Sequence, residues 1–264
     1  MLSCVRTTFA IVLFLTAASI SRAHFSILLP SVAVVKRGEK FTLEYQWGHP
    51  FEHELYDAPR PEAVMVNAPL PAPRFLTSNL REGSVSIGTK KARVYGLDCT
   101  AEHRQDYVFV AQSPPIWTEA DQVFYQDSTK VIVHVQGGKG WDDPFIEKLE
   151  FELVPLTRPY GLEPGMVFQA RVFREQRPLA NCLVEIEHYN SETPEKLPPD
   201  EQITRAAKTD PNGVVSATLT DSGWWCIAAQ CDGGTTLHDG KLFPVRKRAI
   251  LWVHVDRKES SKPK

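Results

Sequence analysis

The sequence lacks the features that mark several common functional classes. Positive charge is not in excess, with 30 Lys and Arg against 32 Asp and Glu, and no basic stripe occurs, so we expect no nucleic-acid partner. There is no phosphate-binding glycine loop, no dinucleotide fingerprint and no Gly-x-Ser-x-Gly nucleophile elbow. We therefore predict no catalytic residues and a protein that is not an enzyme.

Long apolar runs are also missing, apart from one at the N-terminus. Arg6 precedes the apolar run 9–15, and small residues lead to Ser-Arg-Ala at 21–23, the arrangement of a secretory signal peptide. The run is shorter than the about 20 residues that a membrane-spanning helix needs. We expect residues 1–23 to be removed and the mature chain to be periplasmic or secreted, with no transmembrane segment and a polar tail at 257–264.

Cysteine is scarce, and Cys4 falls within the predicted signal peptide. Cys99, Cys182, Cys226 and Cys231 remain, without the paired C-x-x-C spacing of a thiolate zinc site. An even number of cysteines in an oxidising compartment predicts two disulfides, and the sequence leaves all three pairings open. The last two cysteines are close enough in sequence to close a small loop.

The chain is rich in short stretches of alternating polarity, which indicate β-strands. In Lys40–Trp47, apolar Phe, Leu, Tyr and Trp alternate with polar residues, and Val131–Val135 has a similar pattern. Glycine, proline and Asp/Asn turns separate these stretches, so we predict an all-β fold made of two antiparallel β-sandwich domains of the immunoglobulin or transthyretin type. Further stretches are at 150–153, 166–173, 183–189, 214–219, 225–229 and 250–255.

Proline-rich segments suggest the domain organisation. A connector at 155–165 predicts a boundary between an N-terminal sandwich, residues 24–157, and a C-terminal sandwich, residues 158–256. Six prolines lie between Gly48 and Arg81, which predicts a long excursion in which only Pro61–Val66 could form a short strand. Long ordered loops are often functional, so this excursion draws attention to its first residues.

His24 directly follows the predicted cleavage point. Cleavage after Ala23 would give His24 a free α-amine beside its imidazole, and these two nitrogens can chelate one metal ion. Neither group is strongly basic, so both are available as neutral donors near neutral pH. The alternative interpretation is that the peptidase simply cuts before whichever residue comes next.

A second group of candidate ligands follows the predicted strand that ends at Trp47. His49, Glu52 and His53 lie within five residues. Imidazole and carboxylate together suit zinc, nickel, cobalt or copper rather than calcium or magnesium. Pro50 and the missing internal Glu argue against a helical zinc-protease motif. The alternative is a polar loop in which the histidines are incidental.

Two isolated histidines are candidates to complete the metal site. His103 lies in a polar segment after Cys99, and His134 alternates with the valines of the 131–135 strand. A single histidine on a strand is more often structural, so both are secondary candidates. His188, His238 and His254 belong to the second predicted sandwich and are interpreted as surface or loop residues.

Several phrases along the chain together resemble a known family. They are Ala23-His24-Phe25 with Leu28-Leu29-Pro30, Gly48-His49-Pro50-Phe51-Glu52, Gly140-Trp141-Asp142-Asp143-Pro144, Val154 to Tyr160, Thr209 to Gly213 and Gly223-Trp224-Trp225. In this order they resemble the exported bacterial family described as the nickel uptake substrate-specific region, a periplasmic component associated with nickel and cobalt transport. The second predicted sandwich is similar to the transthyretin or carboxypeptidase-regulatory type.

This resemblance implies an extracytoplasmic protein that binds a transition metal and passes it to a membrane metal importer. The N-terminal histidine of the family would correspond to His24, and its His-Pro-Phe-Glu phrase to His49 through Glu52. The C-terminal sandwich would supply stability and contacts. Because no C-terminal membrane helix is expected, any link to an importer would be through contact.

The sequence thus supports three functional hypotheses. The first is an exported metal-binding protein involved in nickel or cobalt uptake or metal handling, with a divalent transition metal (Ni, Co, Zn or Cu) as its cofactor. The second is a copper oxygenase, because an N-terminal histidine and a second histidine form the T-shaped site that such enzymes use. The third is a structural or adhesive β-sandwich protein without metal.

Overall fold

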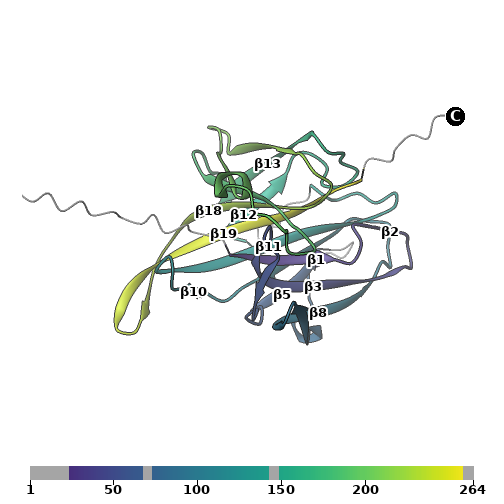
Figure 1. The fold of residues 1–264 in the computed structure, drawn as a ribbon. Coiled ribbons are helices and arrows are strands. Elements are labelled where there is room, and N and C mark those ends of the chain that lie inside the picture. Colours follow the sequence, from purple (N-terminus) through teal and green to yellow (C-terminus); the bar gives the residue numbers. More distant parts are fainter. Residues whose placement is uncertain (1–23, 68–72, 143–148, 258–264) are drawn as a thin grey trace, which may run out of the picture.

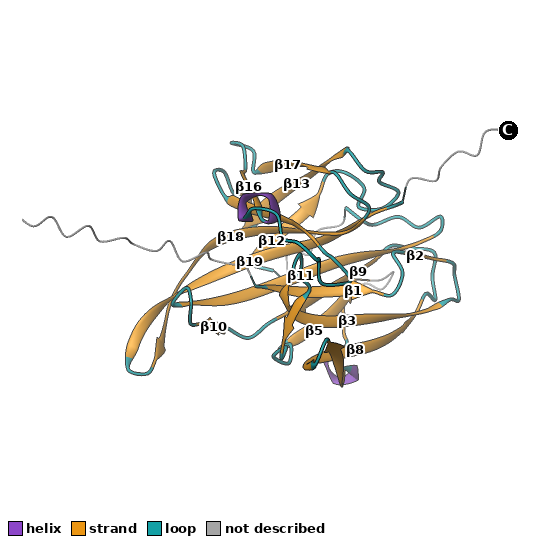
Figure 2. Cartoon of the chain, viewed as in Figure 1, coloured by secondary structure: helices purple, strands orange, loops and turns teal. Residues whose placement is uncertain are grey.

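The structure is a computed structural model that describes residues 24–67, 73–142 and 149–257. The predicted signal peptide and all of the predicted tail except Arg257 lie outside the described residues. Strands make up nearly all the regular structure (Figure 2). The described helices are the single turns α1 (Asp200–Ile203) and η1 (Thr77–Asn79), and none is long and apolar enough to cross a membrane.

The described strands form three sheets, which confirms the predicted all-β class. The first sheet contains β1 (Phe25–Pro30), β3 (Lys40–His49), β4 (Glu54–Tyr56), β7 (Arg81–Ile87) and β8 (Lys90–Thr100). The third contains β12 (Phe151–Pro155), β13 (Met166–Arg174), β14 (Arg177–Pro178) and β17 (Val214–Leu219). The middle sheet contains β2 (Val34–Val35), β5 (Ala63–Asn67), β6 (Arg74–Phe75), β9 (Tyr107–Gln112), β10 (Ile116–Thr118), β11 (Val123–Val135), β15 (Leu183–His188), β16 (Arg205–Lys208), β18 (Gly223–His238) and β19 (Lys241–Val255).

The middle sheet is covered on both faces, which gives the molecule three layers and two cores. In Figure 1, β13 lies above β18 and β19, and β1, β3 and β8 lie below β11. Because successive strand residues point to opposite faces, Ile250 and Trp252 of β19 enter the core shared with the first sheet. Leu251 and Val253 enter the core shared with the third sheet. This double burial explains the nearly continuous apolar run of β19.

The middle sheet also crosses the boundary that the connector predicts. β11, from the first predicted sandwich, pairs with β19 of the second in parallel, from Phe124 opposite Val245 to Val131 opposite Trp252. The fold therefore contains parallel pairs beside its antiparallel ones, and strands from both halves share one sheet. The two-domain division at residue 157 remains a prediction.

The predicted strands are present, and several are longer than the alternation indicated. β3 continues through His49, and β18 and β19 form an antiparallel hairpin that ends at the turn between His238 and Lys241. The proline-rich excursion holds β4, β5, β6 and η1, and β5 (Ala63–Asn67) occupies most of the segment predicted as its one short strand.

The cysteines differ from the prediction of two disulfides, because Cys99, Cys182, Cys226 and Cys231 are all free thiols. Cys226 and Cys231 both lie on the extended strand β18. Five strand residues span about 17 Å, whereas a disulfide requires Cα atoms within about 7 Å. The small loop inferred from their closeness in sequence is therefore wrong, since an extended backbone keeps the two residues apart.

A buried ion pair joins the two halves at the centre of the middle sheet. Asp127 of β11 accepts hydrogen bonds from Arg248 of β19 at 2.7 Å to Nε and 2.9 Å to Nη2. The Asp127 carboxylate also accepts a hydrogen bond from the backbone N–H of Ser26 in β1 at 3.1 Å. The backbone N–H of Asp127 donates to the Ser113 hydroxyl oxygen at 2.9 Å. Arg248 lies over the rings of Phe25 and Tyr125.

The charges of this pair depend on one another. Both side chains are about 1% exposed or less. Burial alone would lower the pKa of Arg248, but the adjacent carboxylate of Asp127 outweighs that effect and raises it above its ordinary value. Removing one partner would leave an uncompensated buried charge, which is much more costly than the loss of a surface ion pair.

We expect Asp127→Asn to lower the free energy of unfolding by about 3–5 kcal/mol, because Arg248 would keep its charge without a carboxylate partner. Urea-induced unfolding would measure the change. The matched control is Asp98→Asn, which removes the carboxylate of an ion pair with Arg81 whose side chains are 62% and 66% exposed. That substitution should cost about 1 kcal/mol or less. If the two substitutions lowered the free energy of unfolding equally, the buried pair would be no more important for stability than an exposed one.

Candidate metal centre

The pairing of β1 with β3 brings two predicted ligands together. In this antiparallel ladder Phe25 lies opposite Gly48 and Ser26 opposite Trp47. One step further along the same ladder, His24 reaches the position opposite His49. Two residues directly opposite in an antiparallel pair have Cβ atoms about 4.5–5.5 Å apart, so their side chains are neighbours.

The rings of the two histidines are in contact. Their centroids are 4.0 Å apart with an interplanar angle of 43°. His49 is 3% exposed and His24 is half-buried. Two imidazoles that share a metal ion place their nitrogens a few ångströms apart, because each metal–nitrogen bond is about 2.0–2.1 Å. The two imidazoles are therefore neighbours that could both donate a nitrogen to one metal ion.

Two aromatic residues that the sequence analysis did not identify flank the histidines. Trp47 stacks on His24 with centroids 4.8 Å apart and an interplanar angle of 16°. Tyr56 of β4 lies 5.1 Å from the His24 ring and 5.8 Å from the His49 ring. Trp47 and Tyr56 face each other in the β3–β4 ladder. The rings together surround the histidine pair with apolar surface, which excludes water and strengthens polar interactions nearby.

Ser26 fixes the end of β1 that carries His24. Its N–H is bonded to Asp127, and its carbonyl oxygen accepts bonds from the Thr129 hydroxyl at 3.0 Å and the Trp252 indole N–H at 3.2 Å. Its hydroxyl lies 2.9 Å from the Tyr45 hydroxyl. Every polar group of Ser26 is thus engaged by another strand. The backbone two residues after His24 is therefore firmly held in place.

Gly48 allows β4 to approach β3 beside the site. A Cβ atom at this position would lie 2.1 Å from the carbonyl oxygen of Glu54 and 2.9 Å from the Cα of Leu55. These atoms are backbone and cannot move independently. Glycine is therefore required here for the tight hairpin that places Tyr56 beside the histidines.

The loop between β3 and β4 is held by the second half of the chain. The N–H of Phe51 donates to Glu187 at 3.0 Å, and the Phe51 carbonyl accepts from the side chain of Asn190 at 2.5 Å. The backbone N–H of Asn190 donates to the Pro50 carbonyl at 3.0 Å. Since this loop begins directly after His49, strand β15 and the residues after it help to position that histidine.

Glu187, which holds this loop, is a nearly fully buried carboxyl group whose pKa is raised. Burial raises the pKa of Glu187 to about 8, while hydrogen bonds from Thr204 and Phe51 oppose the rise and the charge of Glu52 adds to it. Glu187 is therefore mostly protonated at neutral pH. A protonated carboxyl in the folded state means that ionisation at higher pH weakens this part of the structure.

Glu52 and His53 directly follow the histidine pair in sequence, and both lie near residues of the second half of the chain. Glu52 is buried and acts electrostatically on Glu187, and the ring of His53 makes an edge contact with Tyr189 at 5.8 Å. Both residues line a cavity of about 450 Å³ beside the segment 193–197. Burial lowers the pKa of His53, against a hydrogen bond with the Asn190 backbone.

His103 lies at the opposite end of the first sheet from the histidine pair, and His134 lies on β11 of the middle sheet. The start of β3 at Lys40 pairs with Thr100, and His103 is exposed in the loop just after it. Ten-residue β3 extends about 30 Å, with His49 at its other end. The Nδ1 of His134 bonds Asp106, at 2.6 Å, in the segment that follows His103.

His134 has a structural environment. Its ring stacks on Tyr160 with centroids 4.0 Å apart, and the Tyr160 hydroxyl donates to the same Asp106 carboxylate at 3.0 Å. The histidine thus links β11 to the connector between the predicted sandwiches. Within residues 24–67, 73–142 and 149–257, no cluster of three or more His, Cys, Asp or Glu side chains could hold a metal ion. Of the six residues predicted as metal ligands, the structure therefore brings His24 and His49 together, but it does not gather all six at one site.

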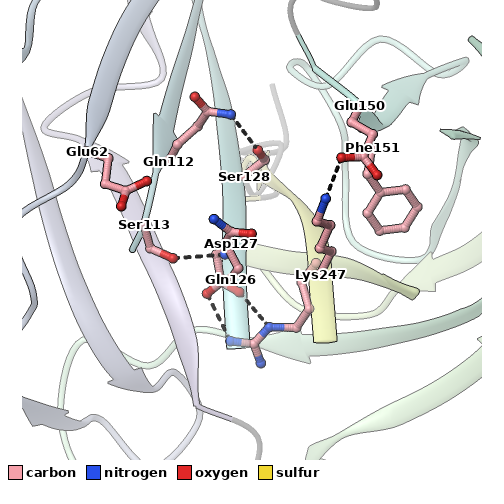
Figure 3. A pocket seen from close by; sticks show the side chains of 10 residues that line it. Glu62, Gln112, Ser113, Gln126, Asp127, Ser128, Glu150, Phe151 and Lys247 are labelled. Atoms are coloured by element: carbon pink, nitrogen blue, oxygen red, sulfur yellow. Dashed lines mark hydrogen bonds and ion pairs between the residues drawn. The ribbon is translucent and has the colours of Figure 1, made fainter. Parts of the chain in front are cut away.

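A second polar cavity lies beside the Asp127–Arg248 pair. Figure 3 shows this cavity, of about 200 Å³, between the middle sheet and the start of β12. Its cations already have carboxylate partners, Arg248 with Asp127 and Lys247 with Glu150. Gln112 donates to Ser128 at 3.4 Å across the same cavity. These pairings stabilise the sheet and do not point to a bound ion.

We expect Gly48→Ala to lower the free energy of unfolding by about 1–3 kcal/mol or more, because the new methyl group would collide with the backbone of β4. Thermal or urea unfolding would measure the effect. Gly83→Ala is the control, since a Cβ there meets only a Val94 side-chain atom at 3.7 Å, an ordinary contact. A tolerated Gly48→Ala would contradict the close approach of β4.

We expect Glu187→Gln to change the pH dependence of stability. The raised pKa means that the folded state holds a proton that the unfolded state has released, so wild-type stability should fall as the pH rises from about 4.5 to about 8. The slope from this one group approaches 1.4 kcal/mol per pH unit. Glutamine stays neutral at every pH. The stability of Glu187→Gln relative to wild type should therefore increase as the pH rises through this window.

Urea unfolding of both proteins at pH 5.5 and pH 8 would test this expectation. Glu82→Gln, on the exposed strand β7, is the control for a general charge effect. A stability difference between wild type and Glu187→Gln that is independent of pH would show that Glu187 is ionised in the folded state throughout.

Comparison with known proteins gives a family and no function. No curated protein matches the chain. Among solved structures, the D0-D1 domain of intimin is 13% identical and covers 88% of this chain and 100% of its own, with a TM-score of 0.22. The adhesin InvE of Yersinia pseudotuberculosis is 9% identical, with 85% of this chain and 58% of that chain covered and a TM-score of 0.21.

A DUF4785 family protein from Legionella pneumophila is 10% identical, with 77% of this chain and 51% of that chain covered and a TM-score of 0.25. Likenesses at these TM-scores carry no argument about this protein. A family model matches residues 21–233, which include both histidines of the pair and most of the middle sheet. The chain belongs to the DUF4198 family, described as a domain of unknown function.

Proposed function

We propose that this protein is an exported, periplasmic transition-metal-binding protein whose site is built on His24 and His49. The observation that carries the proposal is the contact between the two imidazole rings, whose centroids are 4.0 Å apart. Removal of residues 1–23 would make His24 the first residue and add its α-amine to the two imidazoles. The site would then have three nitrogen donors, namely the α-amine and imidazole of His24 and the imidazole of His49.

The surroundings of the pair support a bound metal over an incidental contact. Neutral imidazole is the form that binds a metal, and the two adjacent rings offer two such donors to one ion. Trp47 and Tyr56 restrict the motion of the rings and limit access of water. Ser26 and Gly48 fix the backbone on both sides of the pair.

The donor set points to the later first-row metals. Imidazole and amine nitrogens suit nickel, copper, zinc and cobalt, and affinity for such ligands rises toward copper. The resemblance to the nickel uptake family supports nickel or cobalt as cargo and a membrane importer as partner. Copper would bind more tightly in vitro at the same site, so affinity alone does not identify the physiological metal.

A copper oxygenase is the second candidate, and one observation favours it. The imidazole rings of His24 and His49 are in contact, and cleavage after Ala23 would add an amine beside them. An all-nitrogen set of two imidazoles and one terminal amine corresponds to the T-shaped copper site that such enzymes use. This arrangement would bind both copper oxidation states and permit redox turnover.

We expect the authentic mature protein, beginning at His24, to bind nickel, cobalt, zinc and copper, and a form with one extra N-terminal residue to bind at least about 100-fold more weakly. The extra residue converts the amine to an amide and removes one metal donor. Loss of a residue that only orients a metal ligand costs about 10–100-fold, so loss of a donor should cost at least as much. Competitive titration with each metal, followed by calorimetry or a chromophoric chelator, would measure both affinities.

His49→Ala should weaken binding to a similar degree, and His103→Ala is the matched control because it removes an exposed histidine far from the pair. Circular dichroism of each variant would establish that the fold is retained. Equal affinities for all four proteins would remove the His24–His49 pair from the site. Absence of binding in every form would instead favour a structural β-sandwich protein without metal.

Redox turnover separates the two candidates. With ascorbate and hydrogen peroxide, a copper oxygenase loaded with copper should consume peroxide in proportion to enzyme and oxidise a substrate. A metal-transfer protein should show copper binding without sustained turnover, and should release its metal to a competing ligand.

A further inference from the structure

Two of the four cysteines among the described residues lie opposite each other at one end of the β15–β18 ladder. In the antiparallel pairing of β15 with β18, Leu183 is opposite Gln230 and Val184 is opposite Ala229. One step further along this ladder, Cys182 is opposite Cys231. Cα atoms of directly opposite residues are about 4.5 or 5.5 Å apart, within the 4.4–6.8 Å range of disulfides.

The side chains of the two cysteines share one environment. Cys182 is buried in the core between the middle and third sheets, and Cys231 packs against the same core. The Cys182 Sγ lies 3.2 Å from the carbonyl oxygen of Gln230, the residue before Cys231. Burial raises the pKa of the Cys182 thiol to about 11, and the neighbouring Cys231 adds to the rise.

The other two cysteines are placed where neither can join such a pair. Cys226 points to the core on the opposite face, and its ladder partner Trp252 bonds the Ser26 carbonyl near the histidine pair. Cys99 pairs with Phe41, near the other end of β3. Cys99 and Cys226 are therefore about 20 Å apart along the direction of the strands, which is too far for a disulfide.

Pairing of Cys182 with Cys226 is also excluded by the register. Cys226 is opposite Glu187, five residues along β15 from Cys182, a distance of about 17 Å. The three pairings that four cysteines allow therefore reduce to one possible bridge and two isolated thiols.

We propose that Cys182 and Cys231 form a cross-strand disulfide when the protein meets a disulfide oxidant, and that Cys99 and Cys226 remain thiols. Cys231 is the more exposed of the two, so it is the entry point for the oxidant. Its thiolate attacks a small-molecule disulfide, displaces one thiolate and forms a mixed disulfide.

The Cys182 thiol then loses its proton and displaces the second small thiolate from Cys231. The protein forms one S–S bond and loses two protons, while the oxidant gains two electrons and becomes two thiols. The low reactivity that a raised pKa gives to Cys182 is offset by its fixed position next to the mixed disulfide.

The test is oxidation of the mature chain with glutathione disulfide, followed by thiol counting and non-reducing peptide mapping. The expected result is loss of two of the four thiols and a linked pair of peptides that contain Cys182 and Cys231. Because the bridge closes a loop of about 50 residues, the oxidised protein should melt roughly 10 °C higher than the reduced protein.

Two variants make the test specific. Cys231→Ser, at a partly exposed position, should abolish the linked peptides and the rise in Tm, whereas Cys99→Ser should leave both unchanged. Persistence of all four thiols, a link that involves Cys99 or Cys226, or a stable glutathione adduct on Cys231 with Cys182 still free would each overturn the proposal.

Discussion

The buried ion pair between Asp127 and Arg248 is the interaction on which the arrangement of the strands depends. Its carboxylate joins β11 to β19 and also accepts a hydrogen bond from the backbone N–H of Ser26, so one charged group connects the middle sheet to β1 of the first sheet. A pair so deeply buried is stabilising only when both partners and their hydrogen bonds are present. Its effect on the candidate site is direct, because Ser26 is two residues from His24.

The candidate metal centre illustrates how a sheet can position ligands without a dedicated loop. The antiparallel register sets His24 beside His49, and Gly48 lets the next strand bring Tyr56 to the same place. The loop after His49 is then held by Glu187 and Asn190 from the other half of the chain. The position of each histidine therefore depends on backbone pairing, and the second half of the protein helps to hold His49 in place.

Much of this structure could be predicted from period-two alternation. Strands with one buried face, such as β3, alternate clearly and were identified close to their true ends. The middle strands were harder, because burial on both faces gives a continuous apolar run that conceals the period, as in β9 and β19. For that reason the sharing of one sheet by the two halves was not evident from the sequence.

The candidate site was predictable only in part. His24 and His49 carried recognisable signals, a cleavage point and a strand end, and the structure brings them together. Glu52 and His53 are close in sequence, yet a tight hairpin turns them toward the second half. His103 and His134 lie far from the histidine pair because the strands between them are long. The positions of the histidines in the sequence do not reveal these distances. Trp47 could have been found, since it lies two residues before His49 and therefore shares its strand face.

The shared middle sheet has a consequence for how such a protein can evolve. A module can be exchanged between genes when its core is complete within one continuous segment. Here, a cut near residue 157 would separate β11 from β19 and leave each piece with an unpaired sheet edge and an incomplete core. The two halves are therefore expected to be inherited, duplicated and lost together.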